Sequence, residues 1–144
     1  MRYIAKSLVL ATTALGIAVA PGTGSAGAAQ TGTQSLYAPS ALVLTVTAGD
    51  DALNGSVLRA VTLTCTPRAG GTHPAAGTAC AELRAGGARF ESVVAADSGV
   101  MCTKQWDPVT VTADGVWDGR RIAFTHTFAN SCFKEGADGV VFAF

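Results

Sequence analysis

Four cysteines between residues 65 and 132 limit most strongly what this chain can fold into. Cys65, Cys80, Cys102 and Cys132 form an even set in a small chain with an export signal, which indicates two disulfides rather than free thiols. The sequence allows three pairings. If neighbours along the chain pair, the bridges join residues 15 and 30 apart, and the chain-entropy model gives each roughly 3 to 4 kcal/mol of stabilisation.

The first 28 residues have the three parts of a secretory signal peptide. Arg2 and Lys6 form a basic head, an uncharged apolar run extends from Leu8 to Ala20, and Ala26–Gly27–Ala28 matches an A-x-A cleavage site. The apolar run of 13 residues is short for crossing a bilayer. We therefore expect removal of residues 1–28 and secretion, with no membrane association afterwards.

Residues 29–144, the expected mature chain, fit one domain. They carry 8 basic and 10 acidic side chains, a formal charge of −2. A domain so close to neutrality lacks the basic field that nucleic acid or an anionic membrane requires, so neither is an expected partner. We expect no metal and no cofactor, because no two cysteines have the C-x₂-C spacing and the two histidines are 53 residues apart.

Apolar residues at alternating positions predict five strands. They span Leu36–Thr47, Val57–Thr64, Val109–Thr112, Arg120–Phe128 and Val140–Phe144. Two dipeptides, Asp114–Gly115 and Asp118–Gly119, both have the chemistry of a hairpin turn, because glycine readily adopts a positive φ.

One short helix is predicted between the second and third strands. It begins at Thr72–His73–Pro74, where the missing N–H of proline costs nothing, and it ends at Gly86–Gly87. Its buried stripe consists of Ala76, Ala79, Cys80 and Leu83. Cys132–Asp138 is a candidate second helix, and Phe90–Ala96 stays open between a helical turn and an irregular segment. These elements indicate an α+β fold, with helices packed on one face of an antiparallel sheet.

Catalytic chemistry has no clear signature in the sequence. His126 shares its strand face with apolar residues, which is typical of a half-buried structural histidine, and His73 fits a local cap or a surface residue. Turn chemistry accounts for Asp114 and Asp118, and Trp117 between them fits a packing anchor for the hairpin. No G-x-S-x-G motif occurs, so we do not expect an enzyme.

The stretch Val100–Val109 is the candidate interaction segment. Cys102, if bridged, holds one flank, while Pro108 fixes its own φ and holds Asp107 extended at the other. Polar and long side chains on an extended backbone suit the cleft of another protein better than a core. We interpret the stretch as the reactive loop of a protease inhibitor, with Lys104 entering the specificity pocket. Composition alone fits an ordinary surface loop equally well.

Several segments that resemble one protein family are spread over almost the whole mature chain. In order they are Leu36–Val46, Arg59–Cys65, Gly71–Gly77, Ala79–Cys80, Met101–Cys102, Asp107–Val109, Asp114–Trp117 and Val141–Phe144. With these blocks the chain resembles the Streptomyces subtilisin inhibitor family. The resemblance implies the pairs Cys65–Cys80 and Cys102–Cys132. It also implies a five-stranded antiparallel sheet with two short helices on one face, and a homodimer formed sheet to sheet.

The resemblance further implies a secreted inhibitor of serine endopeptidases whose scissile bond is Lys104–Gln105. Asn130 matches the family asparagine whose side chain supports the loop. The protease-contacting residues would be Met101, Cys102, Thr103, Lys104, Gln105, Trp106 and Asp107. Lysine in place of an apolar primary residue implies trypsin-like targets, with subtilisin-like enzymes still inhibited. Thr103 stands where many members have proline, which predicts a less rigid loop at that point.

Two alternatives come from other functional classes. A secreted hydrolase would need a nucleophile motif that the sequence lacks. A secreted non-catalytic binding module, for cell-wall carbohydrate or a protein partner, would expose Trp106 and Trp117 on one platform and bind independently of Lys104.

Overall fold

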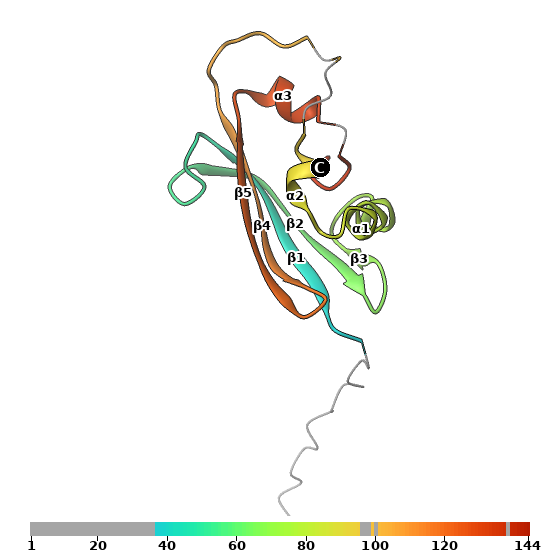
Figure 1. Ribbon diagram of the computed structural model, residues 1–144. Coiled ribbons are helices and arrows are strands. Elements are labelled where there is room, and N and C mark those ends of the chain that lie inside the picture. Colours follow the sequence, from blue (N-terminus) through green and yellow to red (C-terminus); the bar gives the residue numbers. More distant parts are fainter. Residues whose placement is uncertain (1–36, 96–98, 100, 138) are drawn as a thin grey trace, which may run out of the picture. The chain divides into compact units, whose positions relative to one another are not determined.

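The computed structural model of this chain describes residues 37–95, 99, 101–137 and 139–144. The predicted signal peptide and its cleavage site lie outside the described residues. A five-stranded, fully antiparallel sheet with the order β3-β2-β1-β4-β5 forms the framework (Figure 1). Its strands are β1 Ser40–Ala48, β2 Ser56–Thr66, β3 Gly70–Gly71, β4 Val109–Trp117 and β5 Arg120–Phe128. The predicted sheet of five antiparallel strands is confirmed.

Three helices lie on the same side of this sheet (Figure 1). They are α1 Ala76–Ala85, α2 Phe90–Val93 and α3 Ser131–Glu135. The segment that the sequence left open contains α2, so the described residues contain one helix more than predicted. The first helix begins at Ala76, two residues after Pro74, and ends at Ala85 with Gly86 as its C-cap, where the sequence predicted the end. In the described part of the chain, no helix is long and apolar enough to span a membrane.

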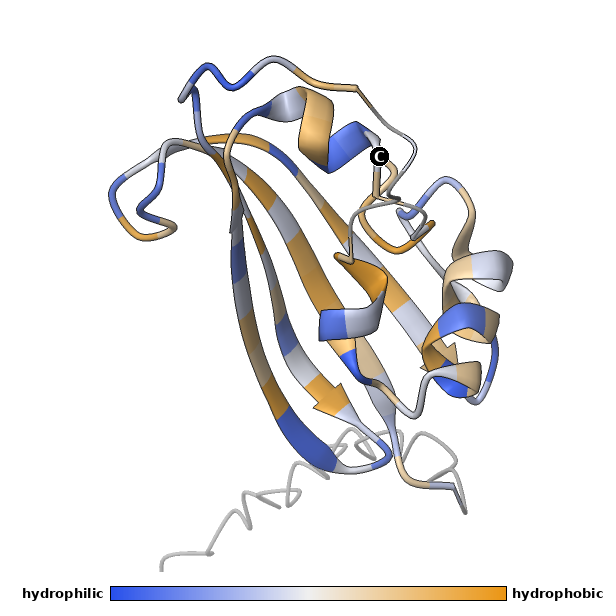
Figure 2. Cartoon of the chain, turned by 45° about the horizontal axis from the view of Figure 1, so that its top comes forward, coloured by the Kyte–Doolittle hydropathy of each residue, from blue (hydrophilic) through white to orange (hydrophobic). Residues whose placement is uncertain are grey.

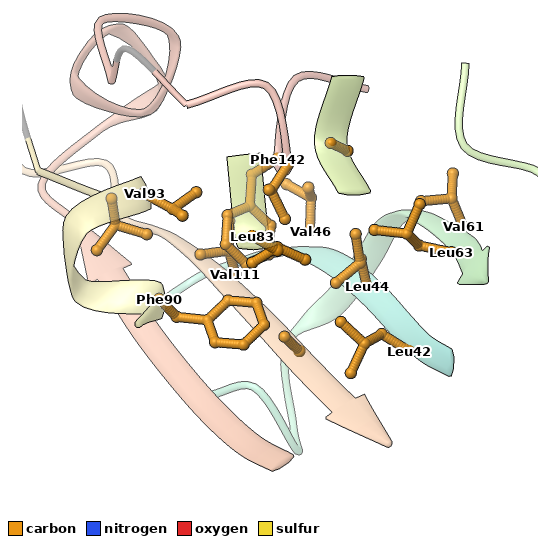
Figure 3. Close-up of a cluster of buried hydrophobic side chains, with 14 of the residues drawn as sticks. Leu42, Leu44, Val46, Val61, Leu63, Leu83, Phe90, Val93, Val111 and Phe142 are labelled. Carbon is orange, nitrogen blue, oxygen red and sulfur yellow. The ribbon is translucent and has the colours of Figure 1, made fainter. Parts of the chain in front are cut away.

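The core lies between the helices and one face of the sheet (Figure 3). Leu44, Val111 and Leu83, from β1, β4 and α1, are fully buried there. The alternation of apolar residues along β1 places its even-numbered positions in this core, which is the expected behaviour of a sheet covered on one side. Cys65–Cys80 joins the end of β2 to α1 inside the same cluster.

The predicted strand Val140–Phe144 is wrong. Val141 and Phe142 are buried in the core, which accounts for the apolar run, but the backbone there forms no ladder. The N–H groups of Val140 and Val141 instead donate to the Glu82 carboxylate, at 2.8 and 3.1 Å. The fifth strand is β3, which pairs with Leu63 and Thr64 of β2.

The turn predicted at Asp114–Gly115 is also wrong, because both residues lie within β4. Gly115 has a φ of +147° and sits so close to β1 that a Cβ would lie 2.3 Å from the Ala41 carbonyl oxygen. The glycine therefore allows the strand to pass a neighbour rather than to turn. Asp118–Gly119 does form the β4–β5 turn, with φ values of 47° and 75°, as predicted.

Candidate functional site

The segment Met101–Pro108 enters β4 without regular secondary structure and carries exposed side chains. Met101 is 98% exposed and Trp106 is 65% exposed, although both are large apolar residues. Lys104 is exposed as well, and among the described residues it forms no ion pair. All seven residues of the predicted contact loop thus lie in one continuous segment at the surface, with only Cys102 partly covered.

The end of this loop nearest β4 is held between two neighbouring strands. The N–H of Asp107 donates to the Ala129 carbonyl at 2.9 Å, just beyond the paired residues of β4 and β5. The Pro108 carbonyl accepts from the N–H of Gly49 at 2.8 Å, on the β1 side. Proline lacks a donor, so its carbonyl is the backbone group through which it can be held. The loop therefore leaves a fixed base.

The other end of the loop is held by the disulfide Cys102–Cys132, which links it to α3. Cys65 and Cys80 form the second bridge, and no described cysteine is free. This is the pairing that the family resemblance implied.

Asn130 holds the middle of the loop. Its side chain is only 7% exposed, and its Nδ2 donates to the carbonyl oxygens of Thr103 at 3.0 Å and Gln105 at 2.9 Å. Its Oδ1 accepts from the N–H of Phe133 at 3.3 Å, so the same residue also caps α3. The predicted support residue therefore contacts the loop directly.

Those two hydrogen bonds orient the backbone around Lys104. The carbonyls of Thr103 and Gln105, on either side of Lys104, both accept from the side-chain amide of Asn130. The backbone on both sides of Lys104 is thus held by a support that is already formed.

The two histidines have structural surroundings. His126 is half-buried with its ring edge-on to Phe128 at 4.5 Å, and burial lowers its pKa below the usual 6.5. His73 is buried, accepting from the N–H of Ala75 at Nδ1 (3.0 Å) and contacting the Val141 carbonyl with Nε2 (3.1 Å). Of the two predicted alternatives, a surface residue does not fit, because His73 is buried; its side chain bonds the N–H of Ala75, the residue before α1, and α1 has no side-chain cap.

The remaining candidates do not form a second site. Trp117 is 7% exposed and packs in the hairpin as predicted, so it cannot share an exposed platform with Trp106. Asp118 accepts from the Ser40 hydroxyl at 3.1 Å as part of the β4–β5 turn region. Within the described residues, no group of three or more histidine, cysteine or acidic side chains could hold a metal ion.

Sequence reasoning missed the backbone contacts of Gly49 and Ala129, which hold the base of the loop. Neither residue carries a side-chain signal, because both act through main-chain atoms. It also missed Leu53, which is 94% exposed in the connection between β1 and β2. The exposure of Leu53 could not be predicted from the sequence, because the segment around it has an ordinary turn composition.

Comparison with known proteins points to one family. The family model described as "Subtilisin inhibitor-like" matches residues 38–130. Subtilisin inhibitor-like protein 2 of Streptomyces rochei is 60% identical over 110 residues, covering 76% of this chain and 96% of the relative. The Transglutaminase-activating metalloprotease inhibitor of Streptomyces mobaraensis is 54% identical over 111 residues, covering 77% and 75%.

A solved structure gives the same result for the fold. The crystal structure of Streptomyces caespitosus sermetstatin in complex with Bacillus licheniformis subtilisin contains a chain that is 45% identical to this one. The match has a TM-score of 0.69 and covers 74% of this chain and 99% of that chain. The similar proteins are named inhibitors rather than enzymes.

Proposed function

Because this chain belongs to the subtilisin inhibitor-like family, we propose that it is a secreted inhibitor of trypsin-like and subtilisin-like serine endopeptidases, with Lys104–Gln105 as the reactive bond. The observation that carries the proposal is the pair of hydrogen bonds from Asn130 to the carbonyls on both sides of Lys104. They support the proposal because they order the loop backbone around Lys104 in the free chain.

Binding would follow from this pre-organisation. The loop would lie in the protease cleft as an extended strand, exchanging main-chain hydrogen bonds with the enzyme. Because the Cys102–Cys132 bridge, Asn130 and the Asp107–Ala129 contact already order the backbone, little conformational entropy remains to be lost. A substrate-like loop therefore becomes a tight ligand.

Lys104 would select the protease. Its exposed ammonium makes no ion pair within the described residues, so it is free to enter an acidic pocket floor of the trypsin type. Its aliphatic stem could also fill a less polar pocket while the charged end stays near water. The relative structure with subtilisin supports the second class of target.

Slow turnover would follow from the same contacts. If the Lys104–Gln105 bond were cut, the bridge to Cys132 would retain the new carboxyl end and β4 would retain the new amino end. Asn130 would still face a carbonyl on each side of the cut. The two ends would remain close enough for the bond to re-form, which disfavours product release.

We also propose a homodimer that forms through the sheet face opposite the helices. Val43 on this face is 47% exposed, an unusual position for valine in a sheet centre. Around it, threonine hydroxyls pair with each other, Thr45 with Thr112 at 2.7 Å and Thr110 with Thr127 at 2.9 Å. These four hydroxyls therefore already have partners within the sheet. Sedimentation of Val43→Arg should give monomers where the parent chain gives dimers.

The test of the inhibitory function is titration of purified chain into active-site-titrated trypsin and subtilisin. Stoichiometric inhibition of both is expected. Lys104→Ala should lose trypsin inhibition while its melting temperature stays unchanged, because the side chain is exposed and supports no contact in the described fold. Unchanged trypsin inhibition by that variant would refute the assignment of Lys104.

A further inference from the structure

The connection between β1 and β2 presents a large apolar side chain to solvent. Leu53 is 94% exposed there, and the first residues of β2 add Val57 and Leu58, which are 60% and 61% exposed. We call residues 49–55 the Leu53 loop. Single exposed apolar residues need no explanation, but here three are clustered within six residues of the chain.

The Leu53 loop is held in one conformation by its own polar residues. The Asp51 carboxylate accepts from the N–H of Leu53 at 2.8 Å, from the N–H of Asn54 at 3.3 Å and from the Asn54 side-chain amide. The N–H of Gly55 donates to the Asp51 carbonyl at 2.9 Å. These bonds lower the pKa of Asp51, so the carboxylate stays charged. Leu53 is therefore displayed on a pre-ordered turn, which keeps the entropic cost of a contact low.

The base of the Leu53 loop is joined to the base of the reactive loop. The N–H of Gly49 donates to the Pro108 carbonyl at 2.8 Å, and the Gly49 carbonyl accepts from the Thr110 hydroxyl at 2.8 Å. Figures 1 and 2 both place the β1–β2 connection beside the stretch that descends into β4. The Leu53 loop thus lies near the part of the reactive loop that follows Lys104.

The size of a protease complex requires contacts beyond the reactive loop. Stable complexes of this kind bury about 800 Å² per partner, supplied by roughly 20–30 residues. Met101–Asp107 are far fewer residues than that. A protease seated on Lys104 must therefore cover neighbouring surface, and the Leu53 loop is a neighbour that offers an ordered, exposed apolar side chain.

We propose that the Leu53 loop is a second contact site for the protease that binds Lys104–Gln105, packing Leu53 on an apolar part of the enzyme outside its active-site cleft. The inference rests on the proposed inhibitory function and adds a surface to it. Its partner is the serine protease itself, on the side that receives the residues after the cut bond.

The test compares inhibition constants of three chains against the same protease. Leu53→Ser removes the apolar side chain and should raise the inhibition constant about tenfold to a hundredfold, mainly through faster dissociation. The matched control is Tyr37→Ser, which removes a side chain that is 73% exposed just before the opposite end of β1. This control should inhibit as the parent does.

The outcomes separate this inference from the function on which it rests. A parent chain that inhibits stoichiometrically, together with Leu53→Ser that inhibits equally well, overturns the second contact and leaves the inhibitor intact. A parent chain that inhibits neither trypsin nor subtilisin overturns both. Circular dichroism of Leu53→Ser should match the parent, because the side chain is exposed and the Asp51 contacts involve its backbone.

Discussion

The side-chain amide of Asn130 donates to the carbonyl oxygen of Gln105 at 2.9 Å, joining the start of α3 to the residue after Lys104. The same nitrogen reaches the Thr103 carbonyl at 3.0 Å. One buried amide thus fixes the backbone on both sides of a single exposed residue. It also ties the loop to the helix that carries Cys132, so the two restraints on the loop share one support.

Asn130→Asp is the sharpest test of this support. The aspartate keeps an oxygen for the N–H of Phe133, and therefore the helix cap, but it places a carboxylate oxygen against two carbonyls. We expect inhibition to weaken by about tenfold to a hundredfold, because two hydrogen bonds are replaced by repulsion. Cleavage of the loop by the protease should accelerate, which mass spectrometry of timed samples would record.

Asn130→Ala is the companion variant, since it removes the cap as well as the loop contacts. It should lose about 1 kcal/mol more unfolding free energy than the loop contacts alone would explain. If both variants inhibit as the parent does, the Asn130 contacts have no role in inhibition.

Removing the bridge between Cys102 and Cys132 should separate folding from inhibition. The double variant Cys102→Ala/Cys132→Ala should unfold more easily by about 3 to 4 kcal/mol in urea, given a separation of 30 residues. Its folded fraction should be cut by the protease and released. The control Cys65→Ala/Cys80→Ala loses comparable stability but leaves the loop anchored, so its folded fraction should still inhibit tightly. Equal inhibition by both double variants would contradict the proposed role of the Cys102–Cys132 bridge.

Gly115→Ala should damage the sheet. A Cβ there would lie 2.3 Å from the Ala41 carbonyl oxygen, and the φ of +147° disfavours any other residue. We expect a loss of at least about 2 to 3 kcal/mol in thermal or urea unfolding, or failure to fold. Gly77→Ala in α1 is the matched control, because nothing lies within 4 Å of the new methyl group. That change should stabilise the fold by about 0.5 to 1 kcal/mol.

His126 should make stability fall in mild acid. Burial lowers its pKa in the folded state below 6.5, whereas the unfolded chain keeps a value near 6.5. Above pH 6.5 the imidazole is mostly unprotonated in both the folded and the unfolded chain. As the pH falls below 6.5, the unfolded chain binds more protons than the folded chain. The free energy of unfolding therefore decreases with falling pH, until the pH lies below the folded pKa as well. His126→Gln should show a flatter melting temperature through this window. The groove beside it also contains the Glu91 carboxylate. An unchanged pH profile would mean that His126 contributes nothing.

How far the sequence predicts this fold depends on the length of each pattern. The alternation from Arg120 to Phe128 predicts β5 with its observed bounds. A two-residue strand such as Gly70–Gly71 has no periodicity and escapes prediction. The apolar run at Val141 and Phe142 signals burial, but a carboxylate from α1 rather than a neighbouring strand satisfies the backbone beside it. Hydropathy cannot distinguish a buried strand from a buried segment whose backbone is bonded by a side chain.

Some residues of the candidate site could be predicted from the sequence, and others could not. Lys104, Cys102 and Asn130 were named from the sequence with the help of a family resemblance, and the structure brings them together. The contacts of Gly49 and Ala129 could not be named, because main-chain groups are the same in every residue. Leu53 was missed since exposure depends on the folded loop.

The most direct test is to incubate the chain with a catalytic amount of trypsin and map the product by mass spectrometry. We predict slow, single cleavage between Lys104 and Gln105, giving a chain heavier by one water that separates into two pieces only after reduction. After reduction, one piece should begin at Gln105. Rapid cleavage at several sites, or a first cut at another bond, would contradict the claim that Lys104–Gln105 is the reactive bond.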